Sequence, residues 1–145
     1  MYVQRNSSII GIIESEAGRM TTSVPLMRTV VQMNYTLNGH RSLKERQYWP
    51  HLVVGNPEQR EALIGEGNVL LERYLGVCAW SGPDRILPGQ QAEVLFALPY
   101  GTPEDNLYSE LLPGATFTIR EGSKIVGSGR VIGPAGWTEQ SRQEG

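Results

Sequence analysis

Short segments in which apolar and polar residues alternate constrain this fold more than any other feature of the sequence. In residues 28–37 the apolar side chains of Val31, Met33, Tyr35 and Leu37 fall two residues apart. A period of two predicts a strand with one buried face. Similar β character returns in residues 51–54, 69–80, 91–98, 116–120 and 124–132. We therefore expect about six short strands and no long helix.

The spacing of these segments predicts an all-β domain. The 145 residues include 17 glycines and 9 prolines, which is typical of a chain with many turns. Several short antiparallel strands predict either a sandwich or a closed barrel. Gly127 and Gly129, two apart on one face of the last strand, favour the barrel, because glycine lets a coiled strand bend and its neighbours approach closely.

Two terminal segments differ from the central one. We divide the chain into an appendage at residues 1–24, a barrel domain at 25–133 and a flexible tail at 134–145, with Trp137 as the only anchor of the tail. The appendage has two alternative interpretations. It is an extra strand on the domain, or the native start is Met20 and the residues before it are disordered.

The segment from Asn56 to Asn68 interrupts the strand pattern. Pro57 suits the first position of a helix and Gly65 suits its end. We expect one or two helical turns here, as an insertion rather than a core element.

The common catalytic patterns are missing from the sequence. No phosphate-binding GxxxxGK[ST] loop is present, and no helix is expected after Gly133 to turn the nearby glycines into a dinucleotide motif. His40 and His51 have no cysteine or carboxylate at metal-ligand spacing. We therefore expect no enzyme activity, no cofactor, no nucleotide and no metal.

The single cysteine, Cys78, lies in an apolar stretch. A free cysteine is among the most buried residue types, so we expect a buried thiol in a reducing cytoplasm. The alternative is an enzyme that uses Cys78, which requires an exposed thiol of low pKa. The apolar run at residues 9–13 is far too short to cross a membrane.

Basic and aromatic residues gather before the second strand. Arg41, Lys44 and Arg46 precede Tyr48 and Trp49 in what we expect to be an exposed loop. Arginine beside tryptophan and tyrosine is typical of residues that dominate protein interfaces, and the same set suits phosphate contacts with base stacking. A simply solvated loop is the third interpretation. The net charge of −2 excludes a global positive field.

Residues 117–132, FTIREGSKIVGSGRVI, closely resemble the final hairpin of the C-terminal domain of bacterial elongation factor Tu and its relatives. The resemblance extends backwards in the same order through LPGQQAEVLFAL, YLGV and QYWPHLVVG. It covers residues 29–132, with gaps at 56–68 and before Leu111.

The resemblance implies a six-stranded antiparallel Greek-key barrel without catalytic residues, here without a GTPase domain. It also implies that Glu121 and Gly122 fall where the family contacts the tRNA backbone. Leu75, Trp49 and Pro99 depart from the family pattern. Our leading hypothesis is a module that binds a protein, of translation or immunity type. The alternative is a module that retains binding to tRNA or other RNA.

Overall fold

The computed structural model describes residues 11–14, 20–37, 46–100 and 107–138. The fold is all-β, and the one helical element in these ranges is the short 3-10 turn η2 (Glu66–Asn68). The strands are β1 (Gly11–Glu14), β2 (Met20–Ser23), β3 (Pro25–Met33), β4 (His51–Val54), β5 (Leu75–Gly76), β6 (Cys78–Ser81), β7 (Gln91–Ala97), β8 (Thr116–Glu121) and β9 (Lys124–Trp137).

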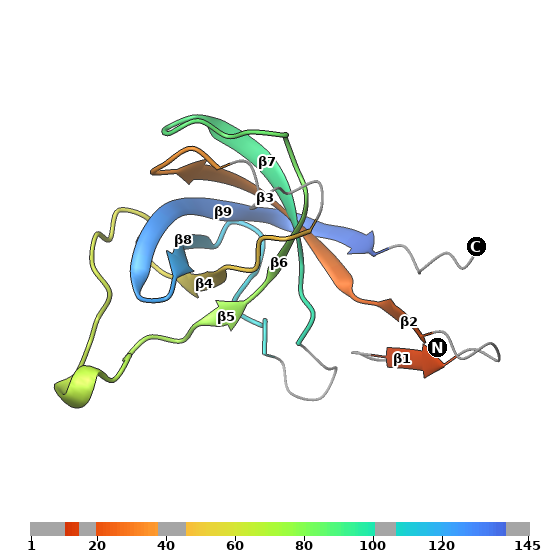
Figure 1. Ribbon diagram of the computed structural model, residues 1–145, viewed down its shortest axis with the longest axis horizontal. Coiled ribbons are helices and arrows are strands. Elements are labelled where there is room, and N and C mark those ends of the chain that lie inside the picture. Colours follow the sequence, from red (N-terminus) through yellow and green to blue (C-terminus); the bar gives the residue numbers. More distant parts are fainter. Residues whose placement is uncertain (1–10, 15–19, 38–45, 101–106, 139–145) are drawn as a thin grey trace.

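Seven of these strands form one antiparallel sheet that curls into a half-barrel (Figure 1). Their order is β5-β4-β8-β9-β3-β7-β6, and β1 pairs with β2 as a separate two-stranded ribbon. The long strand β9 pairs with β8 along one side and with β3 along the other. The all-β class is therefore confirmed, with seven strands in the main sheet where six were expected.

The two edges of the curled sheet come from adjacent residues of the chain. Only Val77 separates β5 from β6. The Val77 amide donates to the Pro50 carbonyl at 3.1 Å, and the Ala79 amide donates to the Tyr48 carbonyl at 2.9 Å. β6 also pairs with β7 on its other side. The segment 75–81 thus supplies both edge strands of the sheet. Its backbone bonds to the residues before β4 on one side and to β7 on the other.

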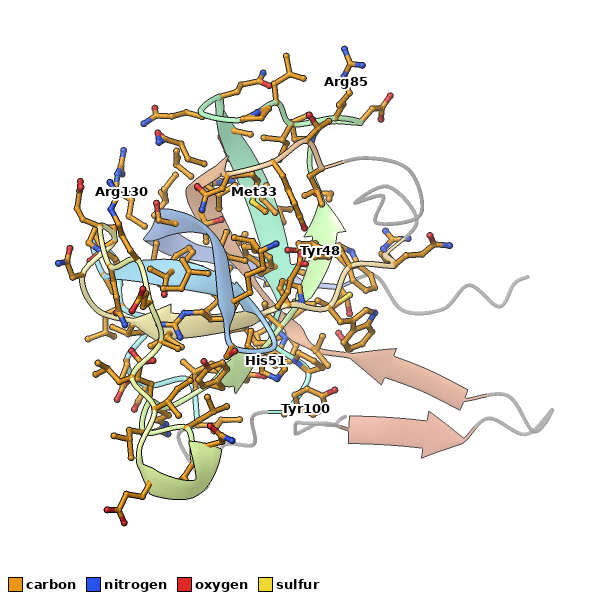
Figure 2. All side chains as sticks on the ribbon, turned by 60° about the vertical axis from the view of Figure 1, so that its left-hand side comes forward. Met33, Tyr48, His51, Arg85, Tyr100 and Arg130 are labelled. Atoms are coloured by element: carbon orange, nitrogen blue, oxygen red, sulfur yellow. The ribbon has the colours of Figure 1, made fainter. Side chains whose placement is uncertain are left out.

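The core follows the alternation seen in the sequence. Val31 and Met33 are 2% exposed, and they pack with Phe117 and Ile119 from β8. Figure 2 shows Met33 toward the middle of the molecule and Arg85 and Arg130 at its periphery. Burying one face of each strand removes apolar side chains from water, which is the main force that holds such a sheet in its curled form.

Close packing explains two of the glycines in β9. A Cβ atom on Gly127 would lie 2.5 Å from the carbonyl oxygen of Gln32, and one on Gly129 would lie 2.5 Å from that of Val30. The expected close approach of neighbouring strands at these glycines is confirmed.

Several boundaries differ from those expected. The strand predicted at 28–37 begins at Pro25 and ends at Met33, although Leu37 is still buried and bridges to Ile86. No helix forms after Pro57, and the single helical turn lies beyond Gly65. The strand predicted at 69–80 is reduced to β5 and β6, because residues 69–71 have no strand of the main sheet beside them and stay exposed.

The C-terminal boundary also needs correction. β9 continues five residues past Ile132, to Trp137, because Pro25 pairs opposite Trp137. Trp137 itself is 58% exposed, and its backbone pairs opposite Pro25 as the last residue of β9. The buried residue is Thr138, whose hydroxyl accepts a hydrogen bond from the Val24 amide and whose own amide donates to the Val24 carbonyl.

Candidate functional site

The residues before β4 point alternately into the protein and out of it. Tyr48 is buried, with 6% of its surface exposed, whereas Trp49 is 53% exposed. The indole of Trp49 donates a hydrogen bond to the Arg46 carbonyl at 3.2 Å. Arg46 has a φ of +57°, which few residues other than glycine adopt. This conformation places Arg46 and Trp49 together at the surface.

Arg46 also contacts an aromatic side chain from β6. Its guanidinium carbon lies 4.0 Å from the ring centroid of Trp80, a cation–π distance. The hydrogen bond between Ala79 and Tyr48 brings β6 beside this segment. We call Arg46, Trp49 and Trp80 the aromatic patch. Trp80 was not predicted as a site residue from the sequence, although its place next to the inward-facing Ala79 indicates a side chain that points outward.

Tyr48 and Glu121 come together on the inner side of the same segment. The hydroxyl groups of Tyr48 and Tyr35 both donate to Oε2 of Glu121, the former at 2.7 Å. Burial, and then the hydrogen bonds with Tyr35 and Glu121, raise the pKa of Tyr48 far above its usual value. The carboxylate of Glu121 therefore joins the final hairpin to the segment before β4.

The remaining predicted site residues have separate locations. Gly122 is exposed in the turn between β8 and β9, with a φ of +62°. Arg41, Lys44 and His40 lie outside the described residues. His51 is exposed and packs edge-on against Tyr74. In the described ranges, no group of three or more histidine, cysteine or acidic side chains is placed to hold a metal ion.

Cys78 is buried, as expected, with 1% of its surface exposed. Desolvation by burial raises the pKa of its thiol to about 11, against a smaller opposite effect of Arg46. A thiol in this state is neutral near pH 7, whereas nucleophilic cysteines are thiolates.

We expect Cys78 to resist 5,5′-dithiobis(2-nitrobenzoic acid) at pH 8 in the folded protein and to react fully in denaturant. Both the inaccessibility of the sulfur and its raised pKa protect it. The absorbance of the released thiolate measures the reaction. Modification of the native protein within minutes would contradict this expectation and would favour the alternative hypothesis of an enzyme that uses Cys78.

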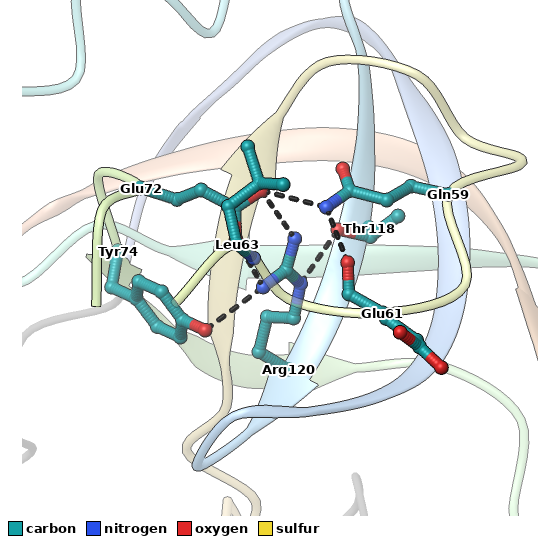
Figure 3. A network of polar contacts seen from close by, with 7 residues as sticks. All are labelled: Gln59, Glu61, Leu63, Glu72, Tyr74, Thr118 and Arg120. Atoms are coloured by element: carbon teal, nitrogen blue, oxygen red, sulfur yellow. Dashed lines mark hydrogen bonds and ion pairs between the residues drawn. The ribbon is translucent and has the colours of Figure 1, made fainter. Parts of the chain in front are cut away.

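A buried ion pair that was not predicted from the sequence lies on the outer side of β8. Arg120 is 0% exposed, and its Nη1 and Nη2 donate to the two carboxylate oxygens of Glu72 at 3.0 and 3.2 Å (Figure 3). Tyr74 and Thr118 accept two further hydrogen bonds from the guanidinium, at 2.8 Å each. The hydrogen bond with Arg120 is the main cause that lowers the pKa of Glu72 to about 2.

A shallow hollow of about 170 Å³ lies elsewhere, over β3, β7 and β9. Its polar side chains are Gln32, Gln91, Thr116, Ser128 and Arg130. This lining has one guanidinium and no carboxylate, so it offers no acid and base pair for proton transfer.

No protein-family model, curated protein or solved structure matches this chain. In the part of the chain that the structure describes, no helix has the length and apolar character needed to cross a bilayer.

Proposed function

We propose that this protein is a cytoplasmic, non-catalytic β module that binds a protein partner through the aromatic patch. The observation that carries the proposal is the exposed Trp49 beside Arg46, whose guanidinium is stacked on Trp80 at 4.0 Å. Tryptophan and arginine are the residue types most enriched among those that dominate interface energies. Stacking holds the arginine in place before binding, which reduces the entropy lost on association.

We also propose that the sheet is a closed, Greek-key barrel similar to the C-terminal domain of elongation factor Tu. In space, β3 lies beside β7, β7 beside β6, and the segment 75–81 beside β4. β4, the segment 75–81 and β7 are thus three consecutive neighbouring strands, and β3 lies beside β7. Read backwards along the chain, this is the 4-1-2-3 order of a Greek key. The bonds from Val77 and Ala79 support closure.

Replacing Trp49 with alanine should weaken the complex with that partner by about 2 kcal/mol, roughly thirtyfold in Kd. The change removes an exposed side chain and leaves the buried Tyr48 in place. Capture from the source-cell lysate on the immobilised 145-residue chain supplies the partner, and titration calorimetry of the purified complex measures the effect.

Trp137→Ala is the matched control, because Trp137 is 58% exposed and lies at the far end of β9. If wild type and Trp49→Ala bind the partner with equal affinity, the aromatic patch is not the binding surface.

RNA binding is a second candidate, because Trp49 and Arg46 also suit the stacking of a base. A filter titration with tRNA separates the two. RNA binding through this patch must weaken as salt rises and must be lost in Trp49→Ala.

A further inference from the structure

A long excursion between β4 and β5, residues 56–74, leaves the body of the molecule and carries η2 at its far end (Figure 1). We call residues 63–71 of this excursion the arm. Two backbone hydrogen bonds close it into a narrow hairpin, from Gly65 to Val69 at 2.7 Å and from Leu71 to Leu63 at 3.0 Å. Ile64 and Leu70 form a bridge between them.

The arm is strongly apolar and exposed. Five of its nine residues are large aliphatic side chains with between 42% and 65% of their surface in solvent: Leu63, Ile64, Val69, Leu70 and Leu71. Single exposed apolar residues are common on proteins, but a contiguous group marks an interaction site.

Hydrogen bonds of the two residues that follow the arm hold it in place. Glu72, the residue directly after the arm, accepts hydrogen bonds from Arg120, from the Leu63 amide at 3.0 Å and from Gln59 at 2.7 Å. Arg73 donates to the Leu107 carbonyl at 3.1 Å. A two-stranded hairpin is at best marginally stable alone. These bonds fix its base, which favours a preformed binding element.

The residues around the arm carry a net negative charge, which indicates the kind of partner that the arm binds. Glu58, Glu61 and Glu66 are exposed and have no ion pair among the described residues, and Arg60 is the single opposing cation between residues 56 and 71. A second copy of the chain would bring like charges together, which opposes association. Anionic lipid and RNA are disfavoured for the same reason.

We propose that the arm docks into an apolar pocket of a partner protein whose rim carries lysine and arginine side chains. This inference depends on the proposed function, but it concerns a surface at the other end of β4 from the aromatic patch. Apolar contact between the arm and the pocket supplies the affinity. Attraction between the acidic residues around the arm and the basic rim of the pocket orients the two proteins and speeds their encounter.

Two variants of the 145-residue chain test the two halves of the proposal. The double variant Leu63→Ser with Val69→Ser removes apolar surface from the arm. The triple variant Glu58→Lys with Glu61→Lys and Glu66→Lys reverses the charge of the acidic residues around it. Leu87→Ser with Leu112→Ser is the matched control, since these leucines are 45% and 63% exposed outside the arm. Thermal unfolding verifies that each variant folds.

The expected result is a protein that the wild type captures from the source-cell lysate, that both arm variants bind at least tenfold more weakly, and that the control binds normally. Its purified complex must also weaken as salt rises. Normal binding by either arm variant would overturn the proposal. So would a dimer of the wild-type chain in light scattering that Leu63→Ser with Val69→Ser abolishes.

The outcomes also distinguish this inference from the proposed function. Loss of the partner in Trp49→Ala with both arm variants unaffected would leave the aromatic patch standing and end the role of the arm. Capture of no protein by the wild type would end both.

Discussion

Replacing Arg120 with methionine is expected to lower the free energy of unfolding by about 3–5 kcal/mol. The substitution leaves the Glu72 carboxylate with only 9% of its side chain exposed and without its cation. It also removes the hydrogen-bond donor of the Thr118 and Tyr74 hydroxyl oxygens, which accept from the guanidinium in the wild type. Urea denaturation followed by fluorescence measures the change.

The matched control is Arg28→Met, which breaks the ion pair of Arg28 with Glu93 at 2.9 Å. Both side chains of that pair are about half exposed, so its loss should cost no more than about 1 kcal/mol. Arg120→Met combined with Glu72→Leu should cost less than the two single changes added together, because no uncompensated charge is then buried. Equal effects of Arg120→Met and Arg28→Met would contradict the buried pair.

The same ion pair predicts a dependence on pH. The pKa of Glu72 is lowered from about 4.5 to about 2, so its carboxylate is charged in the folded state over a range where it is protonated in the unfolded state. Its contribution is therefore complete above pH 4.5 and is lost as the pH falls toward 2. The difference in stability between wild type and Arg120→Met should shrink in that window.

The strands were predictable because one local rule decides them. Alternation from Val31 to Met33 and the pattern of residues 116–132 are set by which side chains face the core, and the final hairpin forms where it was expected. The role of two glycines in β9 was also predictable, because a close approach between strands excludes a Cβ atom at Gly127 and Gly129.

The ion pair could not be seen in the sequence. Arg120 belongs to a strand end followed by Glu121 and Gly122, where charged residues usually face water. Its partner Glu72 lies 48 residues earlier, in a connection with no regular pattern. Only the tertiary fold brings the excursion across the outer face of β8.

The arm was misread for a related reason. Val69 and Leu71 alternate as in a buried strand, so the pattern predicted β structure continuing to Trp80. Periodicity reports that a face is apolar but does not say what covers it. Here the main sheet buries Leu75 and Val77 farther along the segment, whereas Val69 and Leu71 stay largely in solvent.

Replacing Gly129 with alanine is expected to lower the free energy of unfolding by about 3 kcal/mol, the upper part of the range for overfilling a packed core. The added Cβ would lie 2.5 Å from the Val30 carbonyl oxygen and 2.9 Å from a ring carbon of Phe117. The ring can shift slightly, but the carbonyl belongs to β3, which is hydrogen-bonded to β9 and to β7. The clash must therefore move a central strand.

Gly133→Ala is the control within the same strand, since no atom lies within 4 Å of the Cβ position there. Its stability should equal that of the wild type or rise slightly, because alanine restricts the unfolded chain. Urea denaturation of both variants decides the matter. If Gly129→Ala is as stable as Gly133→Ala, then β9 and β3 do not approach as closely as described. The curl of the sheet, which brings its edge strands β5 and β6 together in the segment 75–81, could then not be attributed to close packing at Gly129.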